Sequence, residues 1–149
     1  MTSGPGRRLR RLRTVLACVA AALTLAACDS ARSDLGTSNG PCYVALPVAD
    51  GAVHGAGRLV GVRLVNVAGL RGPAPHVYTA ATAAGAHQSD RVCLVAYEGR
   101  FASSAVRRPT GRSSGRFAVV VVAYPSSHLL GTVIFRRVPI GFGHSHFGA

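Results

Sequence analysis

A chain of 149 residues has room for one ordinary domain, which excludes a multidomain enzyme. Hydrophobic residues make up 48% and charged residues 15%, and the mean hydropathy is +0.29, so a disordered chain and a collagen-like chain are excluded. All 17 basic residues are arginine, against five acidic residues, which gives a formal net charge of +12 and favours anionic partners.

The first 27 residues have the pattern of an export signal. Five arginines between positions 7 and 13 precede an uncharged run at 14–27 that is rich in Ala, Leu and Val. As a helix this run is about 21 Å long, shorter than the roughly 30 Å hydrocarbon core of a bilayer, so it predicts a cleaved signal helix and not a membrane span. The paired arginines also raise the twin-arginine route, but the interrupting arginines favour the general secretory route.

The end of this segment, Leu25-Ala26-Ala27-Cys28, resembles the lipobox of bacterial lipoproteins. The resemblance implies that the Cys28 sulfur carries a diacylglyceryl group, and that acyl chains of the palmitate kind hold the protein on the extracytoplasmic face of the cell membrane. The alternative is an ordinary cleavable signal and a free secreted protein. Residues 29–149 look like small actinobacterial lipoproteins of unknown function.

Removal of residues 1–27 leaves 12 arginines and five acidic residues, a net charge of +7. Residues 28–40 are small and polar, and they predict a lipidated flexible tether with a reach of about 20 Å. A single small β-rich domain is expected at 41–149. Beside a bilayer, this basic domain is expected to attract anionic lipid or wall polymer. Export excludes nucleic acid as its partner, and no protein partner can be named.

Cys42 and Cys93 remain in the mature domain once Cys18 leaves with the signal and Cys28 is lipidated. An even pair in an oxidising compartment predicts a structural disulfide. Such a bond closes a loop of about 50 residues and contributes roughly 4 kcal/mol in the chain-entropy model. The alternatives are two free buried thiols, or a catalytic or metal-binding pair.

Period-two and continuous apolar patterns predict four β-strands, at 58–67, 91–97, 116–124 and 130–138. The run at 116–124 is apolar throughout and predicts a strand covered on both faces, and 125–128 is the expected hairpin connection after it. Residues 44–53 and 77–84 are ambiguous between helix and strand. We therefore expect a mainly β domain, a small antiparallel sheet, barrel or sandwich with one or two short helices.

No segment supports a catalytic constellation. Residues 111–115 match Gly-x-Ser-x-Gly, but the nucleophile elbow needs a strand before the motif and a helix after it, whereas here the predicted strand follows. Acids are also scarce, with only Asp90 and Glu98 in the strand region. We expect a binding or scaffolding domain and not an enzyme.

Metal binding is the alternative function, as a copper or zinc protein or chaperone. On an extended strand, His144 and His146 point to the same side, and His128 or His76 could supply a third nitrogen. No acidic residue near in sequence is available to orient the imidazoles, which favours a packed or solvated tail instead.

A basic cluster on one predicted loop consists of Arg107, Arg108, Arg112 and Arg116. Arg136 and Arg137 follow on the next predicted strand. Guanidinium groups bind phosphate and carboxylate in a bidentate manner, so the loop predicts contact with anionic lipid or wall polymer. A solvated basic loop without a ligand is the alternative.

Overall fold

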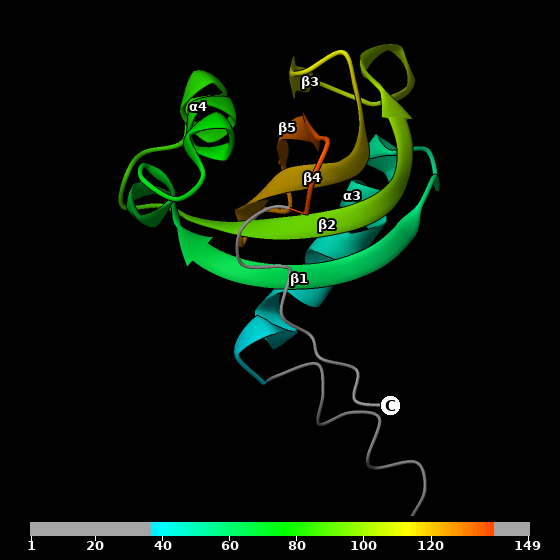
Figure 1. Ribbon diagram of the computed structural model, residues 1–149. Helices are drawn as coiled ribbons and strands as arrows, with labels where there is room; N and C mark the ends of the chain where they lie inside the picture. The colour runs from blue at the N-terminus through cyan, green and yellow to red at the C-terminus, as the bar shows by residue number, and fades with distance from the viewer. Residues whose placement is uncertain (1–36, 139–149) are drawn as a thin grey trace, which may run out of the picture. The chain divides into compact units, whose positions relative to one another are not determined.

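In the computed structural model the described residues are 37–138, so the predicted signal, Cys28 and the C-terminal His144 and His146 lie outside them. Within this range none of the helices has the length and apolar character needed to cross a membrane. The elements follow in the order η2 (Thr37–Ala45), α3 (Leu46–Ala52), β1 (Arg58–Asn66), η3 (Val67–Leu70), α4 (Pro75–Ala83), β2 (Arg91–Ala102), η4 (Ser103–Ala105), β3 (Pro109–Gly111), β4 (Ser114–Tyr124) and β5 (Leu129–Phe135) (Figure 1).

The five strands form one sheet in the order β1-β2-β4-β5-β3. The first four strands of this order pair antiparallel, whereas the short β3 pairs parallel with β5. The predicted small, mainly β fold is confirmed. Of the three arrangements expected, a sheet, a barrel or a sandwich, the described residues form a sheet. Strand β2 runs beyond its predicted end at residue 97 to Ala102, past an irregularity between Glu98 and Phe101.

Both ambiguous segments contain a short helix, which agrees with the one or two helices expected. Helix α3 has Pro47 in its first turn, and α4 begins at Pro75. Proline is favourable there because the first turn of a helix has no intrahelical acceptor for the missing N–H. The alanine-rich sequence that follows Pro75 then continues as helix, because alanine has the highest helix propensity.

The sheet is covered on both faces (Figure 1). Along β2, Cys93, Val95 and Tyr97 pack in one apolar cluster with α3, whereas the alternating Val92, Leu94 and Ala96 pack in a second cluster with α4. Side chains alternate between the faces of a strand, so one strand supplies both clusters. The valines of β4 at 119–122 are at most 1% exposed, which confirms a strand covered on both faces.

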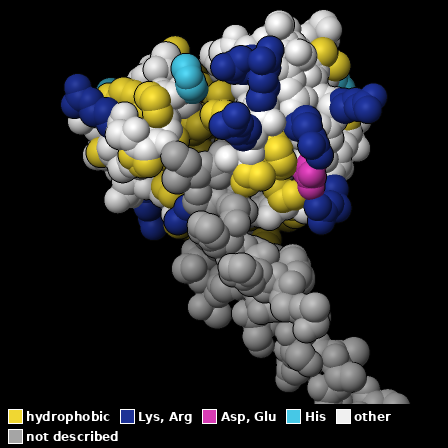
Figure 2. Space-filling model, in the orientation of Figure 1, with side chains coloured by type: hydrophobic (Ala, Val, Ile, Leu, Met, Phe, Trp, Pro, Cys, Tyr) yellow, Lys and Arg dark blue, Asp and Glu magenta, His cyan; other side chains and the backbone are white. Residues whose placement is uncertain are grey.

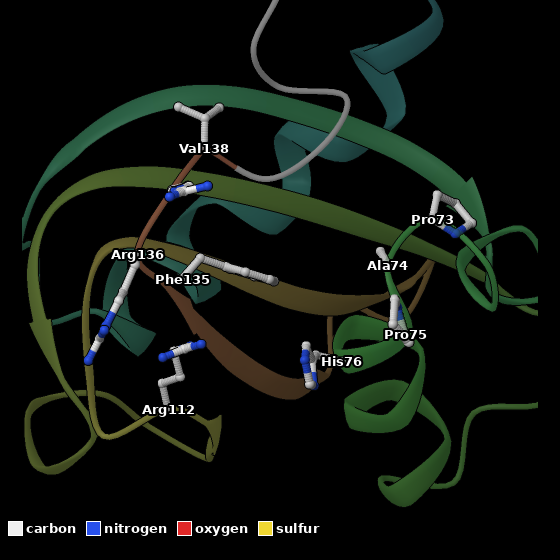
Figure 3. Close-up of a pocket in the computed structure, with 9 residues that line it drawn as sticks. Pro73, Ala74, Pro75, His76, Arg112, Phe135, Arg136 and Val138 are labelled. Atoms are coloured by element: carbon white, nitrogen blue, oxygen red, sulfur yellow. The ribbon is translucent and has the colours of Figure 1, made fainter.

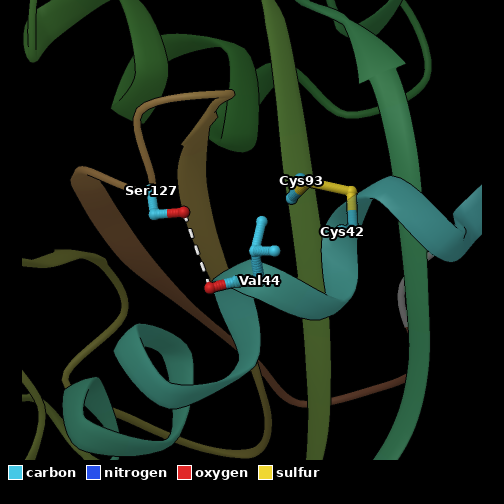
Figure 4. The surroundings of a disulfide bond; sticks show 4 residues. All are labelled: Cys42, Val44, Cys93 and Ser127. Carbon is cyan, nitrogen blue, oxygen red and sulfur yellow. Dashed lines mark hydrogen bonds between the residues drawn. A yellow bond between two sulfur atoms is a disulfide. The ribbon is translucent and has the colours of Figure 1, made fainter.

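A disulfide joins Cys42 in η2 to Cys93 in β2, with a Cα–Cα distance of 5.5 Å, and this confirms the predicted pairing (Figure 4). Near it, the Ser127 hydroxyl in the β4–β5 turn donates a hydrogen bond of 3.5 Å to the Val44 carbonyl. The N-terminal η2 is therefore attached to the start of β2, an inner strand of the sheet, by a covalent bond and to a hairpin turn by a hydrogen bond.

Tyr97 belongs to the core under α3 and is 5% exposed. Burial raises the pKa of Tyr97 to about 12, and the charge of the Asp50 carboxylate adds to this rise. The phenol therefore stays protonated throughout the physiological range. Tyr97 packs with the apolar side chains of the cluster under α3.

Candidate anion-binding site

One end of the sheet gathers arginines from several segments. Neighbouring strands in the series β1, β2, β4 and β5 run in opposite directions. The starts of β1 and β4 therefore lie at the same end of the sheet as the ends of β2 and β5. The exposed arginines at this end, here called the arginine rim, are Arg58, Arg100, Arg112, Arg116, Arg136 and Arg137. Figure 2 shows basic side chains gathered on this side of the domain.

Glu98 is the carboxylate of the rim. Its Oε2 lies 2.7 Å from Nη2 of Arg58, and its Oε1 lies 3.5 Å from Nη2 of Arg116. The two arginine side chains are 74% exposed, so these ion pairs add little stability. Glu98 and Arg116 also line a hollow of about 410 Å³ together with Gly99 and Arg100. This half of the rim stays positive, because one carboxylate faces three guanidinium groups.

The other half of the rim opens into a second hollow of about 540 Å³, here called the basic pocket (Figure 3). Arg112 and Arg136 lie on its sheet side, and the Phe135 ring extends between them and the start of α4. His76 is on the α4 side, next to the loop that leads into the helix. The lining residues are Pro73, Ala74, Pro75, His76, Arg112, Phe135, Arg136, Arg137 and Val138.

The positive charge of the basic pocket is not neutralised by any described residue. Between residues 37 and 138 the acids are Asp50, Asp90 and Glu98, and none of them lines the pocket. The amino end of α4 faces the pocket without a side-chain cap and adds a positive partial charge. An anion placed here would therefore meet several donors and no competing carboxylate from the described part of the chain.

Like charges also lie close together around the last rung of the β4–β5 ladder. Phe117 of β4 pairs with Phe135 of β5. Arg116 is the residue before Phe117, and Arg136 is the residue after Phe135, so the two arginines lie beyond this pair on neighbouring strands. Like charges at such spacing repel and destabilise a sheet. The ion pair of Arg116 with Glu98 offsets part of this repulsion, whereas Arg136 lies at the basic pocket, where no described carboxylate faces it.

The structure separates the four arginines that the sequence placed on one loop. Arg112 joins Arg136 in the basic pocket, whereas Arg116 pairs with Glu98. Arg108 has a positive φ of 46°, and its Nη1 donates a 2.7 Å hydrogen bond to the Leu129 carbonyl, so it fastens the loop to β5.

Arg107 is exposed and lines neither hollow, and its backbone N–H donates to the Ala52 carbonyl at 2.8 Å. Arg58 and Arg100 were missed by the sequence reasoning, because each is isolated in the sequence. Arg58 is the first residue of one expected strand, and Arg100 follows the end of another. Arginines at strand ends in a sheet of alternating direction are the signal that could have found them.

The predicted His144 and His146 metal site lies outside the described residues and stays a prediction. Within the described part of the chain, no three His, Cys, Asp or Glu side chains are grouped as metal ligands. His76 lines the basic pocket near the end of β5, whereas His128 lies in the turn before β5. These two proposed third ligands therefore belong to opposite ends of one strand.

The described domain is thus a small five-stranded sheet, with a helix on each face and a basic pocket at one end. No family model matches this chain, and no curated protein or solved structure matches it.

Proposed function

We propose that this protein is a lipoprotein of the bacterial cell membrane, anchored on the extracytoplasmic face, whose domain binds a phosphate-bearing component of the envelope. The observation that carries the binding role is the basic pocket, where Arg112, Arg136 and Arg137 surround a hollow without a described carboxylate. The planar guanidinium group of arginine can donate two hydrogen bonds at once to the oxygens of a phosphate. The proposed activity is binding and not catalysis.

The anchor is supported by the order of basic segment, apolar segment and Leu25-Ala26-Ala27-Cys28. Intact-mass spectrometry of the protein extracted with detergent from its producer is expected to give a chain that begins at Cys28. The mass should include a diacylglyceryl group and lack the two hydrogens of the Cys42 and Cys93 thiols. In a Cys28→Ala variant the lipid mass should disappear while the two hydrogens stay missing. A soluble native protein without lipid would contradict the anchor.

The binding role predicts that charge in the basic pocket decides phosphate affinity. Replacing Arg136 and Arg137 together by glutamine is expected to weaken binding of inorganic pyrophosphate at least about tenfold, because two charge-assisted contacts are lost. Calorimetry on the full chain in dodecyl maltoside measures this affinity. Binding by the native chain should also weaken steeply as salt rises, since the charges are exposed to solvent.

Two single variants are matched controls for that experiment. Arg107→Gln removes a charge from the loop without touching either hollow, and Arg91→Gln removes one at the end of β2 opposite the arginine rim. Both are expected to bind pyrophosphate within about twofold of the native chain, since screening weakens distant charges. If the Arg136 and Arg137 variant binds like the native chain, or if all variants lose affinity equally, the pocket is not the binding site.

A further inference from the structure

The two sides of the basic pocket differ in chemistry. Guanidinium groups of Arg112, Arg136 and Arg137 form one side, whereas Pro73 and Pro75 lie on the other. Phe135 is half-buried and extends between the sides, and Val138 is 46% exposed at the pocket (Figure 3). Figure 2 likewise shows apolar surface directly beside basic side chains. A bare phosphate ion would leave the apolar surface of the prolines, Phe135 and Val138 uncovered.

The size of the pocket also favours a small molecule. Its volume of about 540 Å³ lies within the range of small-molecule sites, roughly 300–1,000 Å³. Such sites combine an apolar lining with a few polar groups that fix orientation. The exposed apolar side chains gain from being covered by a ligand, because burial of apolar surface is favourable.

We propose that the basic pocket takes a phosphate monoester that carries an apolar group, with the phosphate on the arginines and the apolar group against Phe135, Val138 and the prolines. This inference rests on the proposed function and names its ligand class. The phosphate ester could come from a lipid headgroup or from a soluble metabolite, and both share the chemistry of an anion joined to an apolar group.

Butyl phosphate tests the inference against inorganic phosphate. In calorimetry on the full chain in dodecyl maltoside, butyl phosphate is expected to bind at least about tenfold more tightly, which corresponds to covering about two methylene groups. Phosphatidic acid dissolved in the same micelles separates the two sources. If phosphatidic acid displaces butyl phosphate, the natural ligand is a lipid headgroup. If it does not, the natural ligand is a soluble phosphate ester.

Variants of the apolar side distinguish this inference from the proposed function. Phe135→Ala is expected to reduce the ratio of the butyl phosphate affinity to the inorganic phosphate affinity to about twofold or less. Val138→Ser is a second variant, whose exposed side chain makes it independent of core packing. Leu59→Ala removes an apolar side chain of similar exposure, 41% on β1, and should leave the preference unchanged.

Equal affinity of the native chain for inorganic and butyl phosphate would overturn the inference and leave the proposed function standing. A preference that survives both Phe135→Ala and Val138→Ser would also overturn it, because the apolar group would then lie elsewhere. Absence of any phosphate binding by the native chain would overturn both proposals together.

Discussion

Replacing Cys42 and Cys93 together by alanine is expected to lower the free energy of unfolding by about 4 kcal/mol. The bond spans a sequence separation of 51 residues, so its loss releases a long loop in the unfolded chain. Both cysteines are at most 1% exposed, so the variant also loses packed sulfur atoms in the cluster under α3. Urea unfolding of the full chain in dodecyl maltoside, followed by circular dichroism, measures the change.

Chemical reduction of the native chain provides an independent control for this result. If the covalent link is the cause, reductant should lower the unfolding midpoint of the native chain and leave that of the double alanine variant unchanged. An alanine variant as stable as the oxidised native chain would contradict the prediction. It would mean that the packing between η2 and β2 alone holds the segment in place.

A second large loss of stability is expected from Gly115→Ala. A β-carbon at Gly115 would collide with the carbonyl oxygen of Phe135 and would lie 2.7 Å from Cγ2 of Ile134. Phe135 cannot yield as a flexible side chain would, because the colliding atom belongs to the backbone. We expect a loss of about 3 kcal/mol or more, at the upper end of overpacking effects. Urea unfolding measures it, and far-ultraviolet circular dichroism reports whether the fold persists.

Gly51→Ala is the matched control for Gly115→Ala. Gly51 lies in α3, and a β-carbon added there meets nothing within 4 Å. The same substitution is therefore expected to raise stability by up to about 1 kcal/mol, because alanine is favoured over glycine within a helix. Similar effects at both positions would show that the close approach of β5 to Gly115 is not what requires glycine.

The main strands could be predicted from the sequence because their side-chain patterns are long and regular. The run at 116–124 is an example, since its uninterrupted valines require cover on both faces. Strand β3 was missed, because three residues carry no periodicity and its parallel pairing depends on where β5 lies. The extension of β2 was missed because Gly99 interrupts the apolar alternation near the irregularity in its pairing with β4.

The candidate site was less predictable than the fold. Reading along the chain groups Arg107 with Arg108 and Arg112, but the pocket groups Arg112 with Arg136 and His76. That grouping depends on strand order and on where α4 crosses the sheet, and neither follows from local sequence. The disulfide was predictable for the opposite reason, because compartment and cysteine count constrain the pairing without knowledge of the topology.

The disulfide also determines how a pulling force travels through the molecule. Tension applied at Thr37 passes along the first part of η2 to Cys42 and then crosses the sulfur bridge to Cys93, near the start of β2, so it bypasses the part of η2 that follows Cys42. Strand β2 is hydrogen-bonded to β1 on one side and to β4 on the other. Load that enters the described domain from its N-terminal side would thus pass into a strand that is hydrogen-bonded on both sides.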